Sequence, residues 1–173
     1  MRRVLSIVGS LLLIASLAPT PSAVDAATGP EPILVHFAGD GEVEVDDGEH
    51  RLHAGISLPG DVAVAPDGAL IVADSGHGRV RRIGPDGTVS TLHDAREGIS
   101  DVAVDANGDV YFSIPSAHVV RRVDATGTTV VTPIGTGTAG DSGDGGPAAD
   151  AQLQWPVNLD IDVERRRLFV TDK

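Results

Sequence analysis

The residues whose types and spacing suggest chemistry lie in one glycine-rich stretch, "GDSGDGGP", Gly140 to Pro147. Ser142 carries a hydroxyl that a neighbouring base could convert into a nucleophile. Asp141 and Asp144 carry carboxylates, which are ligands that Ca²⁺ prefers. A third interpretation involves no chemistry, because glycines permit turns with positive φ and short Asp and Ser side chains bond nearby amides.

The nucleophile and the metal site are both poorly supported. With Asp144 treated as an insertion, the stretch resembles the Gly-Asp-Ser-Gly-Gly-Pro sequence of chymotrypsin-like serine proteases, which also need a His base and an Asp to orient it. The chain has six His, but without Cys none can lie in the cysteine-flanked motif of that family. The EF-hand places ligands at every second position, whereas Asp141 and Asp144 are three apart. We therefore favour a structural loop and keep these two Asp as the candidate metal ligands.

The amino terminus has the features of an export signal. Arg2 and Arg3 precede an apolar run from Val4 to Ala18, and Val24-Asp25-Ala26 is a small-residue cleavage site. The run is shorter than the roughly 20 residues of a membrane-spanning helix. We therefore assign residues 1–26 to a signal peptide and 27–32 to a short linker, and we expect a secreted or cell-envelope protein without membrane insertion once the signal is removed.

The composition narrows the class of partner. The chain has a net charge of −12, and without residues 1–26 it has 11 basic and 24 acidic residues, a charge of −13. An acidic surface repels phosphate, so we expect no nucleic-acid partner. Without Cys, no disulfide can help to hold the fold, and the 147 residues after the signal must be stabilised by their core.

Comparison of the chain with itself reveals a repeat of 40 residues. Val62-Ala63-Val64 recurs as Val102-Ala103-Val104, and Arg81-Arg82-Ile83 recurs as Arg121-Arg122-Val123. A third copy begins at Leu159-Asp160-Ile161. Such a fixed period is the signature of a repeat architecture.

Each complete copy is predicted to form four short strands. In the first copy "VAVA" and "ALIVA" flank Asp67-Gly68, which predicts a type I′ hairpin, and Asn107-Gly108 predicts the same turn in the second. Two further strands follow, and four antiparallel strands per roughly 40 residues is the period of a β-propeller blade. The fold class is therefore all-β, a partial propeller of about two and a half blades. We place blade one at 61–92, blade two at 101–134 and the start of blade three at 158–173.

Two segments carry a family resemblance. "DGALIVADSGHGRVRRIGPDGTVSTL" resembles an NHL repeat, and "IGTGTAGDSGDGGPAADAQLQWPVNLDID" is similar to a long connection of bacterial NHL proteins, including those likened to the NHL domain of teneurins. The resemblance covers about residues 33–173. It implies a ring of about six blades, so the other blades would come from a longer chain or an oligomer. It also implies that the strand at Ile33 to Phe37 is a lone outer strand whose partners lie elsewhere.

The long connection contains Ser142, which is therefore predicted to lie between the last strand of blade two and the first strand of blade three. An earlier copy of this connection runs from Gly39 to Pro59, where "AGISLP" parallels "AQLQWP", Ala151 to Pro156. That copy has no Gly-Asp-Ser-Gly, so the backbone route does not require a serine.

The candidate ligand-binding residues lie where the innermost strands begin. Asp61, Asp101 and Asn158 precede the first strands of the three blades, and these strands surround the axis of a propeller. His77 and His118 lie in loops at the same end. Carboxylates gathered around one axis are costly unless a cation, water or ligand compensates them. The alternative is that each side chain caps backbone amides at the entry to its strand.

We expect a non-catalytic exported propeller that binds a protein or glycan partner, without a cofactor or with Ca²⁺ at most. The alternative is a metal-dependent propeller enzyme similar to gluconolactonases or to peptidylglycine amidating lyases, with its site in the central tunnel. The fold alone does not choose between the two functions.

Overall fold

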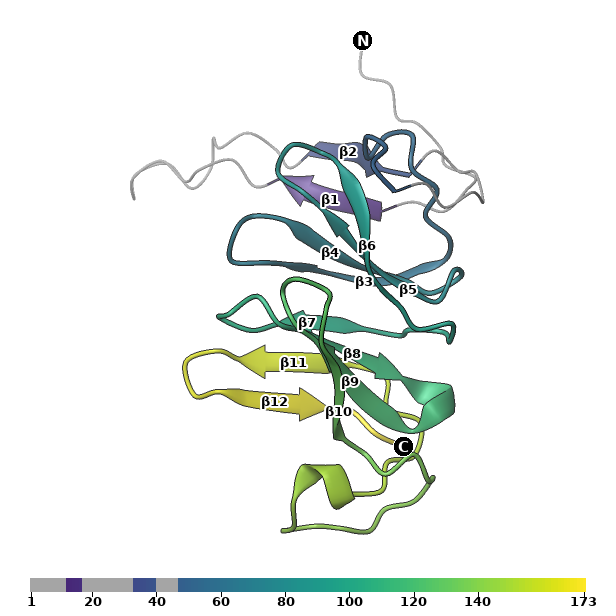
Figure 1. The fold of residues 1–173 in the computed structure, drawn as a ribbon, viewed down its shortest axis with the longest axis vertical. Helices are drawn as coiled ribbons and strands as arrows, with labels where there is room; N and C mark the ends of the chain where they lie inside the picture. Colours follow the sequence, from purple (N-terminus) through teal and green to yellow (C-terminus); the bar gives the residue numbers. More distant parts are fainter. Residues whose placement is uncertain (1–11, 17–32, 40–46) are drawn as a thin grey trace.

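The computed structural model describes residues 12–16, 33–39 and 47–173. Its described residues form β-strands joined by turns, with two short 3₁₀ helices and no α-helix (Figure 1). The strands lie in two four-stranded and two two-stranded sheets, all of them antiparallel. The expectation of an all-β fold built from four-stranded antiparallel blades is confirmed.

Blade one contains the strands in sequence order, each paired with the next. Its strands are β3 (Pro59–Val64), β4 (Leu70–Asp74), β5 (Arg79–Ile83) and β6 (Val89–Asp94). Blade two repeats the order with β7 (Val102–Val104), β8 (Val110–Ile114), β9 (Val119–Val123) and β10 (Val130–Ile134). The two blades stack face to face, as the repeat predicts (Figure 1).

Blade three is represented by its two inner strands, β11 (Leu159–Asp162) and β12 (Arg167–Val170). The connection that leads to it, residues 135–157, contains the 3₁₀ helix η2 (Ala148–Asp150) and extends below the sheets in Figure 1. We call these 23 residues the long connection. The other 3₁₀ helix, η1 (Pro115–Ala117), joins β8 to β9.

The strands of blades one and two are apolar on both faces because each of these blades lies between two other sheets. Successive side chains of a strand point to opposite faces of the sheet. On β4, Ile71 and Ala73 therefore contribute to the core between blades one and two, and Val72 contributes to a second core with Ile56 and Ala38. The continuous apolar sequence of the strand follows from this double burial.

The turn type predicted for the first hairpin of each blade is wrong. A type I′ turn needs positive φ at both central residues, but here Gly68 (83°) has positive φ and Asp67 does not. The N–H of Gly68 donates to the carbonyl of Ala65 (2.9 Å), so the turn begins one residue earlier. This position places Pro66 second, where its fixed φ favours a type I turn that is followed by a left-handed glycine bulge. The second blade has the same turn at Gly108 (85°).

The predicted strand near Ile33 is present as β2 (Ile33–Ala38), but it is not a lone strand. It pairs antiparallel with β1 (Leu12–Ser16), which lies within the segment interpreted as a signal peptide. The apolar run of that segment thus forms backbone hydrogen bonds with β2. Phe37 and Ala38 of β2 pack on the face of blade one that points away from blade two.

None of the described helices has the length and apolar character needed to cross a membrane.

Candidate functional site

The structure brings together the three residues predicted at the starts of the inner strands. We call Asp61, Asp101 and Asn158 the inner-strand row. Asp61 lies within β3 and not before it, which corrects its predicted position, whereas Asp101 and Asn158 directly precede β7 and β11. The three residues therefore follow one another from blade to blade.

Each Asp of the row binds the next blade. The Asp61 carboxylate accepts a hydrogen bond from the backbone N–H of Val102 (3.4 Å), the first residue of β7. The Asp101 carboxylate accepts one from the N–H of Leu159 (3.1 Å), the first residue of β11, and one from the side-chain amide of Asn158 (3.1 Å). The row thus satisfies the first amides of β7 and β11 and fixes one blade to its neighbour.

The two carboxyl groups of the row are electrostatically coupled. Burial, the hydrogen bond to Asp61 and the negative charge of Asp61 raise the pKa of Asp101 to about 6, while hydrogen bonds from Leu159 and Asn158 oppose the shift. The residue is only 5% exposed. Burial in a medium of low dielectric disfavours a second negative charge next to the first. Within the described residues, no group of three His, Cys, Asp or Glu side chains is arranged to hold a metal ion.

The two loop histidines have different roles. The Nδ1 of His77 lies 2.9 and 3.0 Å from the two carboxylate oxygens of Asp74, which is fully buried at the end of β4. His118 has a left-handed backbone (φ 58°), and its Nδ1 accepts a hydrogen bond from the N–H of Trp155 (3.2 Å). One histidine therefore stabilises a buried carboxylate, and the other holds the long connection.

Ser142 is exposed and lies in the long connection, as the sequence predicts. Its hydroxyl donates to the side-chain carbonyl of Gln152 (2.8 Å), and its own carbonyl accepts the N–H of Gln152 (2.8 Å). Both contacts connect the two arms of the loop. Asp141 and Asp144 are also exposed, and neither takes part in a described three-residue metal cluster. The contacts around Ser142 are those of a structural loop.

Comparisons with known proteins agree with this architecture. The family model of the NHL repeat matches residues 57–83, which span β3, β4 and β5. Residues 57–83 are an NHL repeat. The search of curated proteins gave no match.

Solved propellers show the same fold. A gluconolactonase from Xanthomonas campestris is 23% identical, with a TM-score of 0.54 over 68% of this chain and 35% of that one. A catalytically inactive virginiamycin B lyase from Staphylococcus aureus, solved with quinupristin, is 11% identical, with a TM-score of 0.51 over 83% of this chain and 40% of that one. The chain thus spans two fifths or less of these neighbours, and the likeness establishes a partial propeller.

Two residues that the sequence interpretation did not select have an unusual backbone. Leu58, at the start of the NHL repeat, and Trp155, at the end of the long connection, have positive φ angles of 45° and 63°. The left-handed region disfavours bulky L-residues, and each of the two also precedes a proline, Pro59 or Pro156, which favours an extended conformation. Their side chains are nevertheless 73% and 45% exposed. The parallel between "AGISLP" and "AQLQWP" already placed these two residues at equivalent positions.

The same contact holds the backbone next to both residues. In the NHL repeat, the Asp74 carboxylate accepts the N–H of Ser57 (2.8 Å), the residue before Leu58. In blade three, the Asp172 carboxylate accepts the N–H of Gln154 (2.8 and 2.9 Å), the residue before Trp155. Asp74 is the last residue of the second strand of blade one, and Asp172 comes two residues after the second strand of blade three. The fold thus holds the backbone before each outward-pointing apolar residue by a carboxylate from the blade that the connection enters.

Asp74 is itself held by a buried cation. The Arg81 guanidinium, fully buried on β5, lies 3.6 Å from the Asp74 carboxylate and 3.1 Å from that of Asp47. Buried charges persist when they are paired and hydrogen bonded. The structure thus places Arg81 in the core of the NHL repeat.

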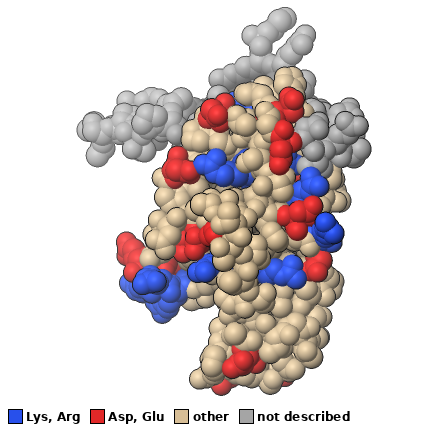
Figure 2. Space-filling view, viewed as in Figure 1, with Lys and Arg blue, Asp and Glu red and all other residues tan. Residues whose placement is uncertain are grey.

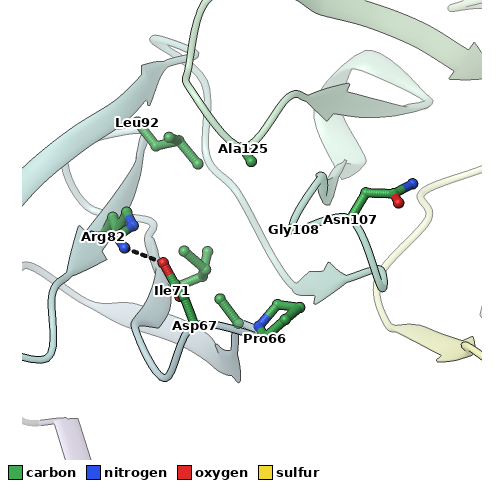
Figure 3. A pocket seen from close by; sticks show the side chains of 9 residues that line it. Pro66, Asp67, Ile71, Arg82, Leu92, Asn107, Gly108 and Ala125 are labelled. Atoms are coloured by element: carbon green, nitrogen blue, oxygen red, sulfur yellow. Dashed lines mark hydrogen bonds and ion pairs between the residues drawn. The ribbon is translucent and has the colours of Figure 1, made fainter.

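A pocket of about 110 Å³ opens between the NHL repeat and blade two, on the side of their β-turns (Figure 3). The ion pair between Arg82 and Asp67 lines the side of blade one, together with Leu92. Blade two lines the other side with Asn107, Gly108 and Ala125. Pockets for small-molecule ligands usually enclose about 300–1,000 Å³. The pocket is therefore small, and it contains none of the residues predicted to bind a ligand.

Proposed function

We propose that the protein is an exported, non-catalytic NHL-repeat propeller module that binds a protein or glycan partner outside the cell. The observation that carries the proposal is the outward presentation of Leu58 and Trp155. Strained backbone conformations persist only where the surrounding structure enforces them, and they cluster at functional sites. Exposed aromatic residues in fixed conformations are also the side chains that contribute most to binding interfaces.

The inner-strand row supports the same proposal. One carboxylate oxygen of Asp61 accepts the amide of Val102, and one of Asp101 accepts the amide of Leu159, in the next blade. A general base or nucleophile must instead direct its oxygen toward a substrate. These contacts assign the row to the joints between blades. Export is supported by the basic and apolar character of residues 1–26 and by their cleavage site.

The proposal is tested by capture with matched variants. The secreted protein is immobilised and exposed to surface proteins and cell-wall polysaccharides of the producing cells. One double variant, Leu58→Asn with Trp155→Asn, removes the two outward side chains, and Asn tolerates the left-handed conformation. The other, Asp61→Asn with Asp101→Asn, alters the row. We expect a saturable partner that the first double variant loses and the second retains.

Metal analysis of the same preparations is the measurement that can contradict the proposal. A tightly bound, equimolar Ca²⁺ or Zn²⁺ that disappears with the Asp61→Asn and Asp101→Asn changes would contradict the proposal and favour a metal-dependent enzyme. Loss of the captured partner in the row variant alone would also contradict it. Circular dichroism of each variant establishes that it is folded before either result is used.

A further inference from the structure

The long connection, which includes Trp155, differs in charge from the rest of the molecule. Residues 123–164 contain no Lys and no Arg. The long connection within this range carries Asp141, Asp144 and Asp150, all exposed. In Figure 2 the lobe at the bottom of the view bears red acidic atoms and no blue basic atoms, whereas the upper part mixes both signs. The field around the long connection is therefore negative, which attracts a positively charged partner.

The Trp155 ring already faces a cation of the chain itself. The Lys173 ammonium nitrogen lies 5.9 Å from the centroid of the ring. The negative face of an indole attracts an ammonium or guanidinium group within about 6 Å. Trp155 remains 45% exposed beside Lys173, so the indole also presents surface to the outside.

The backbone that carries the ring is held in position before any partner arrives. The backbone N–H of Trp155 donates to His118, and Gln154 is fixed at its N–H by Asp172 and at its carbonyl by the N–H of Lys173 (3.0 Å). These contacts come from two blades and keep the left-handed conformation of Trp155. Because the backbone of the anchor is already ordered, binding costs less conformational entropy.

We propose that Trp155 and the acidic long connection form a docking site for a Lys- or Arg-bearing segment of a partner protein. A cationic side chain of the partner stacks on the indole, and the carboxylates of the connection attract the remaining positive charges. The inference rests on the proposed function, since it names the partner class of a binding module. A neutral glycan would use the ring but not the charge of the connection, so the dependence of affinity on salt separates the two partners.

The experiment uses a hexaarginine peptide as the probe and the full secreted chain as the receptor. Trp155 is the only tryptophan, so its fluorescence reports directly on the site. We expect saturable quenching by hexaarginine that weakens several-fold between 50 and 300 mM NaCl. The variant Trp155→Leu copies the residue that the fold accepts at position 58, and calorimetry should show about a tenfold loss of affinity, the size expected for one cation–π contact.

One control variant and two contrary outcomes complete the test. Leu58→Asn changes the equivalent position of the other connection and should leave the affinity for hexaarginine unchanged. Equal affinity of Trp155→Leu and the wild type would overturn the inference, because the peptide would then bind by charge alone. Binding of cellohexaose that depends on Trp155 and is insensitive to salt would replace the protein partner by a glycan. In that case the proposed function would stand and only the present inference would fail.

Discussion

Asp101, at the contact between blades two and three, provides a quantitative prediction because it is buried next to the carboxyl group of Asp61. The pKa of Asp101 is raised to about 6, mainly by burial and then by the Asp61 carboxylate, from 3.8 in the unfolded chain. A raised pKa means that the proton on this group stabilises the fold. The contribution of this proton to the free energy of unfolding is complete below about pH 3.8 and is lost as the pH rises through about 6.

The substitution Asp101→Asn removes this titration while keeping the shape of the side chain. Its amide oxygen can still accept the N–H of Leu159, and its NH₂ group can donate to Asp61 as the protonated acid does. The difference between about 6 and 3.8, at about 1.4 kcal/mol for each pH unit, sets a ceiling of about 3 kcal/mol for the gain in unfolding free energy above pH 6. For a domain of this size the ceiling corresponds to roughly 6–12 °C in Tm.

The assay is thermal unfolding followed by circular dichroism at pH 4.0, 6.0 and 8.0. We expect the Tm difference between Asp101→Asn and the wild type to be near zero at pH 4.0 and positive at pH 8.0. Asp141→Asn, whose side chain is exposed in the long connection, controls for the loss of one negative charge. A variant that is less stable than the wild type at all three pH values would refute the reasoning, because the charge of Asp101 would then be required by Leu159 and Asn158.

Three further predictions follow from the buried network, the loop and the amino terminus. Asp74→Asn should lower the unfolding free energy by roughly 3 kcal/mol, since it removes the buried one of the two carboxylates that pair with the Arg81 guanidinium. The exposed Asp94→Asn serves as the control, and equal melting curves would disprove the role. Ser142→Ala should change stability by less than about 0.5 kcal/mol, and the wild type should not react with a fluorophosphonate, so stoichiometric labelling would overturn the structural interpretation of the loop. Amino-terminal sequencing of secreted protein should begin at Ala27, and an intact Met1 would contradict the cleavage site.

Much of the fold was predictable because the sequence repeats, so that the strands expected in one copy can be checked against those in the other. The offset of 40 residues between Val62 and Val102 located equivalent strands without any knowledge of their partners. The turn type was not predictable from Asp67-Gly68 alone, since the turn begins one residue earlier, at Ala65. The pairing of β2 with Leu12–Ser16 was missed because an apolar run indicates export by its composition, whereas strand pairing depends on which edges lie nearby.

The candidate site was predicted in part. Equivalent positions at the starts of inner strands placed Asp61, Asp101 and Asn158 in one row, but the sequence did not reveal that each Asp binds an amide of the next blade. Leu58 and Trp155 were missed because bulky residues before proline are expected to be extended. Their left-handed conformation depends on carboxylates that are distant in sequence, and only the tertiary structure shows these contacts.

The most direct test of the proposed binding surface is amide hydrogen exchange of the secreted protein with and without saturating hexaarginine. The account predicts slower exchange in residues 151–158, around Trp155, and unchanged exchange at Val102 and Leu159, whose amides are bonded by the inner-strand row. Slower exchange at Val102 and Leu159 with no change around Trp155 would place the binding surface at the inner strands and contradict the account.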